Sequence, residues 1–263
     1  MNCVLLTSNS LRHKYVSNKI ANEFDLELII TEEKSDKIED TKGLNEEDKH
    51  LIKSHFKKRA SSENIYFSDY SHFPKNTEHI KVANGKINSQ FIHNRLLNID
   101  PDAIFLFGTS IIKPFILKSF KNKIINLHLG LSPYYKGSGT NLWPLYFDEP
   151  ECVGTTIHLA EEKVDAGAIL YQLRPDLCSG DTIHDIGNKT IKKAGHVYPQ
   201  IVKKYLMGEI NPQKQTPLKG KTLKISDFTP SILRKTIQKI ENGLIKDYLS
   251  NKKYRDNSKP IVH

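Results

Sequence analysis

Several residue types and patterns are scarce in this sequence of 263 residues. It holds only three cysteines, Cys3, Cys152 and Cys178, and their odd number and wide spacing argue against a disulfide framework and a zinc site. We interpret all three as reduced residues in or near the core. No apolar run approaches the roughly 18 residues of a membrane span, and no basic segment opens the chain. We therefore expect a cytoplasmic protein without a membrane partner.

Motifs of several common sites are also missing. The chain has no G-x-G-x-x-G or P-loop pattern, and no Gly-rich phosphate motif follows the first predicted strand, so we do not expect NAD to bind in the usual way. H-E-x-x-H, C-x-x-C and G-x-S-x-G are absent as well.

The charge of the chain is strongly positive, with a formal net charge of +9. Lys greatly outnumbers Arg and is spread along the whole chain together with abundant Asn and Ile, which indicates a background bias rather than a basic patch. An acidic small molecule fits this charge as well as a nucleic acid does. We expect no nucleic-acid partner.

Apolar periodicity predicts an α/β fold. Residues 3–7 and 26–30 are expected strands, and the helical pattern between them makes a β-α-β opening, which is typical of a parallel sheet. Further strands are expected at 80–82, 103–107, 123–126, 153–160 and 168–173, and further helices near 51–56, 87–98, 114–120, 182–207 and 231–249. We predict one main domain over residues 1–208 and a small C-terminal subdomain, a ribbon plus a helix, over residues 209–263.

Asn126 and His128 stand at the end of a predicted strand. Residues two apart in an extended segment face the same way, so both side chains would point into one cleft. An amide can donate to a developing oxyanion, and an imidazole can move a proton near neutral pH. The alternative is a plain strand end whose polar groups bond the following turn.

Asp165 would join them if the hairpin 153–173 folds back over the same sheet edge. Its carboxylate would then orient His128 and raise the pKa of the imidazole. The alternative is a turn in which Asp165 bonds its own backbone. We interpret His158, in the alternating strand before this loop, as structural.

Two segments, "INLHLGLSPYYKGSGTNLWPL" and "VGTTIHLAEEKVDAGAILYQ", resemble the catalytic core of the N10-formyltetrahydrofolate-dependent formyltransferase family. The family shows an Asn-X-His at a strand end, a Pro turn leading to a Gly, and an Asp-X-Gly after a "GxTxH" strand. The matching residues here are Asn126, His128, Pro133, Gly137, Gly154, His158, Asp165 and Gly167. The resemblance implies a Rossmann-like, mostly parallel sheet with helices on both faces.

The resemblance also implies roles for these residues. Asn126 would stabilise the oxyanion on the formyl carbon, His128 would assist proton transfer, and Asp165 would hold His128 and a relay water. N10-formyltetrahydrofolate would be the co-substrate, with no metal. It would lie along the strand end and the loop after the "GxTxH" strand, with these cofactor-binding residues: Phe105, Phe107, Gly108, Glu161 and Val164.

The acceptor amine is less determined, because "LHLGLSPYYKGSGTNLWPL" departs from the runs of the purine-pathway and tRNA enzymes. We expect the acceptor to be an amino-deoxy sugar on a nucleoside diphosphate. Such a compound would be a precursor of a surface polysaccharide such as a lipopolysaccharide O-antigen. Its predicted substrate-binding residues are Tyr134, Tyr135, Lys136 and Gly137. A phosphoribosylglycinamide or methionyl-tRNA formyltransferase, or a non-catalytic folate-binding scaffold, is the alternative. The C-terminal subdomain could form a homodimer interface.

Overall fold

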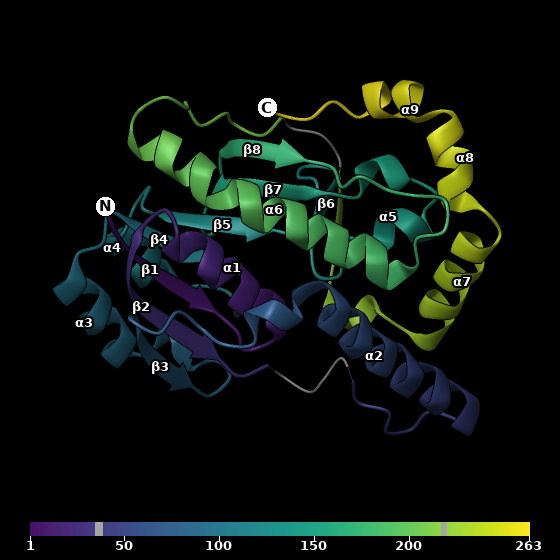
Figure 1. The fold of residues 1–263 in the computed structure, drawn as a ribbon, viewed down its shortest axis with the longest axis horizontal. Helices are drawn as coiled ribbons and strands as arrows, with labels where there is room; N and C mark the ends of the chain where they lie inside the picture. Colours follow the sequence, from purple (N-terminus) through teal and green to yellow (C-terminus); the bar gives the residue numbers. More distant parts are fainter. Residues whose placement is uncertain (35–38, 217–219) are drawn as a thin grey trace.

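A computed structural model describes residues 1–34, 39–216 and 220–263, and its centre is a seven-stranded sheet (Figure 1). The strand order is β3-β2-β1-β4-β5-β7-β8. β1 to β5 run parallel, and β7 and β8 continue the sheet antiparallel. The strands are β1 Asn2–Thr7, β2 Asp25–Glu32, β3 Glu78–Val82, β4 Ala103–Leu106, β5 Ile124–His128, β7 Thr155–Leu159 and β8 Ile169–Leu173.

Helices cover both faces of this sheet, as predicted. The helices are α1 Leu11–Ala21, α2 Glu46–Phe67, α3 Gln90–Ile99, α4 Pro114–Ser119, α5 Trp143–Tyr146, α6 Ile183–Leu206, α7 Pro230–Glu241, α8 Leu244–Ser250 and α9 Lys252–Ser258. α1 and α6 lie on one face of the sheet, and α3 and α4 lie on the other (Figure 1). Alternate strand residues pack against these two pairs of helices. This period-2 division of apolar side chains is what a sheet buried on two faces requires.

The sheet leaves one polar corner on the α3/α4 face. Ile125 and Leu127 of β5 belong to the core under α6, so Asn126 and His128 point to the opposite face. The same alternation puts Thr156 and His158 of β7 on that face, because Asn126 pairs with His158 and His128 pairs with Thr156. Four polar side chains therefore gather at the carboxyl end of β5.

The C-terminal segment has more helices than the one predicted, because the expected helix is divided and α9 follows it. The single helix expected over residues 231–249 is two helices, α7 and α8, because Gly243 between them takes a left-handed conformation with φ of 97°. The expected ribbon is β9, Lys221–Leu223, which pairs in parallel with a short strand that the sequence did not reveal, β6, Tyr135–Gly137. The division at residue 209 stays a proposal.

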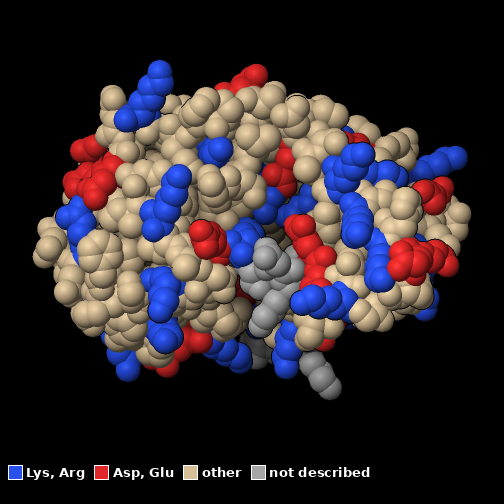
Figure 2. All heavy atoms as spheres, turned by 90° about the horizontal axis from the view of Figure 1, so that it is seen from below, with Lys and Arg blue, Asp and Glu red and all other residues tan. Residues whose placement is uncertain are grey.

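Three features of the structure relate to the composition: its surface charges, its helices and its cysteines. Figure 2 shows one face of the molecule, on which basic side chains are interspersed with acidic and neutral ones. Among the described residues, no helix combines the length and apolarity that crossing a bilayer requires. Cys3 and Cys152 are fully buried, whereas Cys178 is exposed, so the core interpretation of Cys178 is wrong.

Candidate active site

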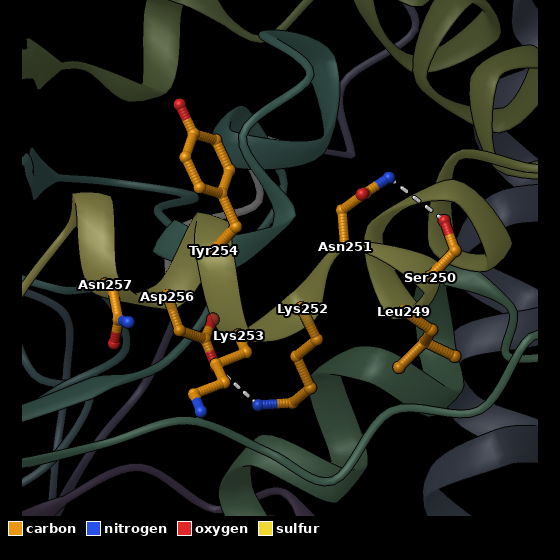
Figure 3. A pocket seen from close by; sticks show the side chains of 8 residues that line it. All are labelled: Leu249, Ser250, Asn251, Lys252, Lys253, Tyr254, Asp256 and Asn257. Atoms are coloured by element: carbon orange, nitrogen blue, oxygen red, sulfur yellow. Dashed lines mark hydrogen bonds and ion pairs between the residues drawn. The ribbon is translucent and has the colours of Figure 1, made fainter.

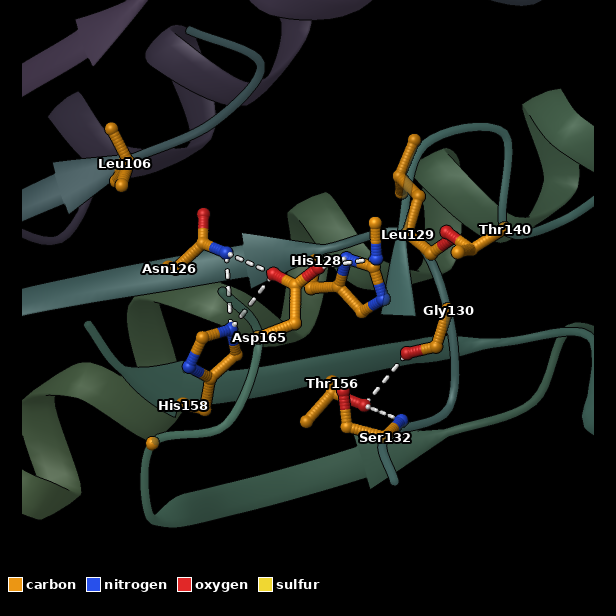
Figure 4. A network of polar contacts seen from close by, with 12 residues as sticks. Leu106, Asn126, His128, Leu129, Gly130, Ser132, Thr140, Thr156, His158 and Asp165 are labelled. Carbon is orange, nitrogen blue, oxygen red and sulfur yellow. Dashed lines mark hydrogen bonds and ion pairs between the residues drawn. The ribbon is translucent and has the colours of Figure 1, made fainter. Parts of the chain in front are cut away.

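Two of the predicted catalytic residues, Asn126 and His128, each lie within contact distance of the third, Asp165. Asn126 and His128 end β5, and Asp165 comes from the loop that joins β7 to β8 (Figure 4). That loop turns because Asp165 adopts a left-handed conformation, with φ of 50°, which aspartate tolerates better than most residues. The hairpin thus folds back over the carboxyl end of β5, and the carboxylate faces His128.

Asp165 is the centre of this network. Its Oδ2 accepts a 2.8 Å hydrogen bond from the Gly137 amide and lies 3.3 Å from His128 Nδ1. Its Oδ1 lies 3.5 Å from His158 Nε2 and accepts a 3.4 Å bond from the Asn126 amide. The simple-turn interpretation, in which the carboxylate bonds its own backbone, is therefore wrong.

The electrostatics keep Asp165 ionised. Burial alone would raise the pKa of this carboxyl, but the two imidazoles and the Gly137 amide outweigh burial and lower the pKa to about 2. A buried carboxylate that is charged at neutral pH can stabilise positive charge on His128.

His128 is almost completely buried, and burial lowers the pKa of its imidazole, so the resting ring is neutral at pH 7. Its Nε2 donates to the Tyr135 carbonyl at 3.1 Å, because a carbonyl can only accept. Nδ1 then faces Asp165, so a proton taken up there would give both N–H groups an acceptor. The site can therefore accept a proton and stabilise the imidazolium that results.

Asn126 and His158 form the other half of the network. His158 Nδ1 donates to the Leu159 carbonyl at 2.8 Å, which leaves Nε2 to accept a 3.0 Å bond from the Asn126 amide. The Asn126 carboxamide oxygen points away from both partners (Figure 4). An oxyanion would take the amide hydrogen that now makes the longer contact to Asp165, and the oxyanion role of Asn126 stays a prediction.

His158 is the residue whose place in the site we underestimated. Alternation on its strand favoured a structural role, yet the same alternation faces it toward Asn126 and Asp165. Its place in the "GxTxH" pattern was the signal that could have identified it.

The predicted acceptor-binding residues differ from one another in how exposed their side chains are. The Tyr135 side chain is 1% exposed, and its hydroxyl donates to Glu149, so it cannot line a pocket, and that part of the prediction is wrong. Tyr134 is half-buried and donates to the Pro260 carbonyl. Lys136 and Gly137 are partly exposed beside Asp165.

The predicted folate-binding residues divide in a similar way. Phe105 and Phe107 belong to the core under α1 and α6, so their side chains cannot contact a ligand and only their backbone could. Gly108 comes two residues after the carboxyl end of β4, and Glu161 and Val164 are exposed on the Asp165 loop. The backbone around Gly108 and this loop remain the predicted folate site.

No metal centre is built from the described part of the chain: no cluster of three or more His, Cys, Asp or Glu there could hold an ion. An open hollow of about 880 Å³ lies over α8 and α9, where Lys252 pairs with Asp256 (Figure 3). No residue of the Asp165 network lines that hollow. The Asp165 network and this hollow are separate features of the molecule.

Comparison with known sequences decides the family. A family model described as formyl transferase matches residues 28–202, well over half of the chain. The chain belongs to the formyl transferase family. The resemblance seen in the two sequence segments, and with it the predicted fold, is confirmed.

Two curated members of this family are about equally similar to the chain. Phosphoribosylglycinamide formyltransferase of Haemophilus influenzae is 30% identical over 139 residues, which cover 52% of this chain and 65% of that protein. GDP-perosamine N-formyltransferase of Brucella melitensis is 30% identical over 131 residues, 49% of this chain and 50% of that protein. The matched segment thus spans less than two thirds of each relative.

Solved formyltransferase structures share the fold. The N-formyltransferase of Helicobacter canadensis, in complex with folinic acid and dTDP-3-aminofucose, aligns with a TM-score of 0.56 at 17% identity. The alignment covers 90% of this chain and 80% of that one. At this identity the alignment supports the architecture and not the substrate.

Proposed function

We propose that this protein transfers the formyl group of N10-formyltetrahydrofolate to the amine of an amino-deoxy sugar on a nucleoside diphosphate. The observation that carries the proposal is the buried Asp165–His128 pair beside the Asn126 amide, at the carboxyl end of a parallel strand. Ligands of open α/β sheets usually bind just beyond the carboxyl ends of the parallel strands. A scaffold that only bound folate would have no use for an ionised carboxylate paired with a buried imidazole.

The network fits each step of formyl transfer. The acceptor amine attacks the formyl carbon, and the carbonyl oxygen becomes an oxyanion to which Asn126 can donate. His128 takes the proton that the attacking nitrogen loses, while Asp165 stabilises the imidazolium. Return of that proton to the N10 nitrogen of the folate allows the bond from this nitrogen to the formyl carbon to break. The products are the formamide and tetrahydrofolate.

An anionic acceptor fits the charges near the carboxyl ends of β1 and β2. Arg12 is buried in an ion pair with Glu63, and Arg59 lies 3.4 Å from the same carboxylate. Lys34 follows β2, and a Cβ on Gly108 would lie 3.7 Å from its Nζ. Burial lowers the pKa of Lys34 to about 7, and an anion bound at the carboxyl ends of these strands would favour the charged form of this side chain, as a diphosphate would. The folate and sugar nucleotide in the Helicobacter canadensis complex are consistent with this choice of ligands.

Phosphoribosylglycinamide is the second candidate acceptor. It also carries a phosphate, and the match to the Haemophilus influenzae enzyme favours it as much as the match to the Brucella enzyme favours a sugar. The geometry of the Asp165 network is the same for both acceptors, so the assay has to separate them.

A panel of acceptors tests the proposal. The protein is incubated with N10-formyltetrahydrofolate and, separately, dTDP-, UDP- and GDP-amino sugars, phosphoribosylglycinamide and methionyl-tRNA, and absorbance reports the release of tetrahydrofolate. We expect turnover with a nucleotide sugar and none with tRNA. His128→Ala should retain the fold and lose at least about a hundredfold in kcat. Folate binding without turnover on any acceptor would support the scaffold alternative instead.

A further inference from the structure

The backbone of β6 holds two of the catalytic side chains. The Tyr135 carbonyl accepts from His128 Nε2, and the Gly137 amide donates to Asp165 Oδ2. Residues two apart in a strand present their backbone groups to the same edge, so one edge of this three-residue strand faces the site. A shift of β6 would therefore move the partners of His128 and Asp165 together.

The other edge of β6 is held by the C-terminal segment. Lys221 donates from its amide to the Tyr134 carbonyl at 2.8 Å, and the Ser138 amide donates to the Leu223 carbonyl at 2.9 Å. Two-stranded pairs are weak by themselves, and this one is reinforced at Glu149. That carboxylate accepts from the Tyr135 hydroxyl and from Lys221 and Lys259, both at 2.9 Å.

The same segment also holds the Asp165 loop, through Gln215. The Gln215 amide nitrogen donates to the Asp165 carbonyl at 2.8 Å and to the Gly167 carbonyl at 2.9 Å. Two carbonyl acceptors determine which end of the carboxamide faces the loop. Gln213, two residues earlier, fixes the approach of the segment through its backbone, which exchanges bonds of 2.7 and 2.8 Å with Ile169.

We propose that Gln215 is a positioning residue for the reaction. Its two hydrogen bonds hold Asp165 in the left-handed conformation that aims the carboxylate at His128 and the Gly137 amide. This conformation costs free energy in a residue other than glycine, so the loop needs an external restraint to keep it. The C-terminal segment thus acts as a strap across the catalytic corner. Only the predicted effect of Gln215 on turnover rests on the proposed function, and its effect on the position of Asp165 does not.

Gln215→Ala and Gln213→Ala form a matched pair of variants. Both shorten a glutamine of the same segment, but no hydrogen bond joins the Gln213 side chain to another described residue, and that side chain is exposed. The full-length proteins are compared in kcat, in KM for both substrates and in hydrogen exchange of the Gly137 amide by NMR. The Leu5 amide in β1 serves as the reference for global opening. Exchange at Gly137 reports the Asp165 contact directly and needs no turnover.

We expect Gln215→Ala to lower kcat by roughly ten- to a hundredfold, with each KM changed less than about threefold, because only the placement of Asp165 changes. The Gly137 amide should exchange about tenfold faster relative to Leu5. Gln213→Ala should match the wild type in all these measurements. If no acceptor gives turnover, the proposed function fails and the exchange data alone decide the role of Gln215.

Other outcomes overturn the positioning role. Unchanged exchange at Gly137 in Gln215→Ala would show that the side chain does not hold Asp165, whatever happens to kcat. Faster exchange with an unchanged kcat in an active enzyme would show that this placement does not matter. If Gln215→Ala does not fold, Gln215→Met keeps the volume without the donor and takes its place. Failure of both to fold would make Gln215 a structural residue.

Discussion

Replacing Asp165 by asparagine tests the electrostatic core of the proposed mechanism. The carboxylate lies 3.3 Å from His128 Nδ1 and nearly all of it is buried. Two unit charges at this distance interact by about 5 kcal/mol at an effective dielectric constant of about 20. Asn has almost the same size and can still accept from the Gly137 amide. Its NH2 group then replaces the oxygen that accepts the 3.4 Å bond from Asn126, so the change removes the charge and this one long hydrogen bond.

The loss should appear in the rate. Because the imidazolium forms only as the amine loses its proton, the missing attraction raises the barrier more than it weakens binding. At 1.36 kcal/mol per factor of ten, a loss of about 5 kcal/mol would lower the rate by several thousandfold. This value is an upper limit, because the asparagine dipole replaces part of the lost attraction. We expect kcat of Asp165→Asn to fall by about a hundred- to a thousandfold, with little change in KM.

The pH profile gives the same test a direction. His128 must be neutral to take up a proton, and Asp165 raises the pKa of an imidazole that burial lowers. Without the carboxylate this pKa falls further, so the acid limb of kcat/KM should move to lower pH. The measurement is the initial rate of tetrahydrofolate release from pH 4.5 to 8.

Asp181→Asn is the control for a buried carboxylate outside the site. Asp181 is buried and ion-paired with Lys189 at 2.6 Å, and it caps the Cys178 amide. This variant should lose stability without losing kcat. A kcat of Asp165→Asn within about tenfold of the wild type, or an acid limb that moves to higher pH, would refute the electrostatic reasoning.

Three further predictions concern neighbouring features. Gly130→Ala should cost about 1–3 kcal/mol of unfolding free energy in urea titrations and also lower kcat, because the added Cβ would lie 2.6 Å from His128 Nε2. Lys34→Gln should raise KM for a phosphate-bearing acceptor by about tenfold and leave KM for the folate unchanged. Lys42→Gln, which changes an exposed lysine, should alter neither KM. An acceptor KM in Lys34→Gln equal to that of the wild type would show that Lys34 does not contact the acceptor. The stability that Asp165 contributes is present above pH of about 4 and is lost as pH falls toward 2. The difference in unfolding free energy between the wild type and Asp165→Asn should therefore narrow by about 2 kcal/mol over that range, and a constant difference would contradict the lowered pKa.

Predictions from the sequence succeeded where a local pattern determines the outcome. The β-α-β opening, the strand at 103–107 and the long helix near 182–207 follow from apolar periodicity, and the structure contains each of them within a few residues. Gly243, by contrast, interrupts a periodic stretch, and the sequence alone did not show that it separates α7 from α8. Tyr135 was assigned to a pocket because it follows the motif, but packing against Trp143 and Cys152 buries it.

The sequence by itself determined the kinds of groups available: an amide and an imidazole two residues apart at a strand end, and an aspartate in a Gly-containing loop 37 residues beyond the imidazole. Those types and that order sufficed to identify the family. Only the tertiary structure decided that His158 joins them, that β6 supplies their backbone partners and that Gln215 holds the Asp165 loop. Apart from the bond between His128 and the Tyr135 carbonyl, these contacts connect residues separated by 28 to 50 positions, and a local pattern carries no information about such pairs until the sheet and its strap bring them together.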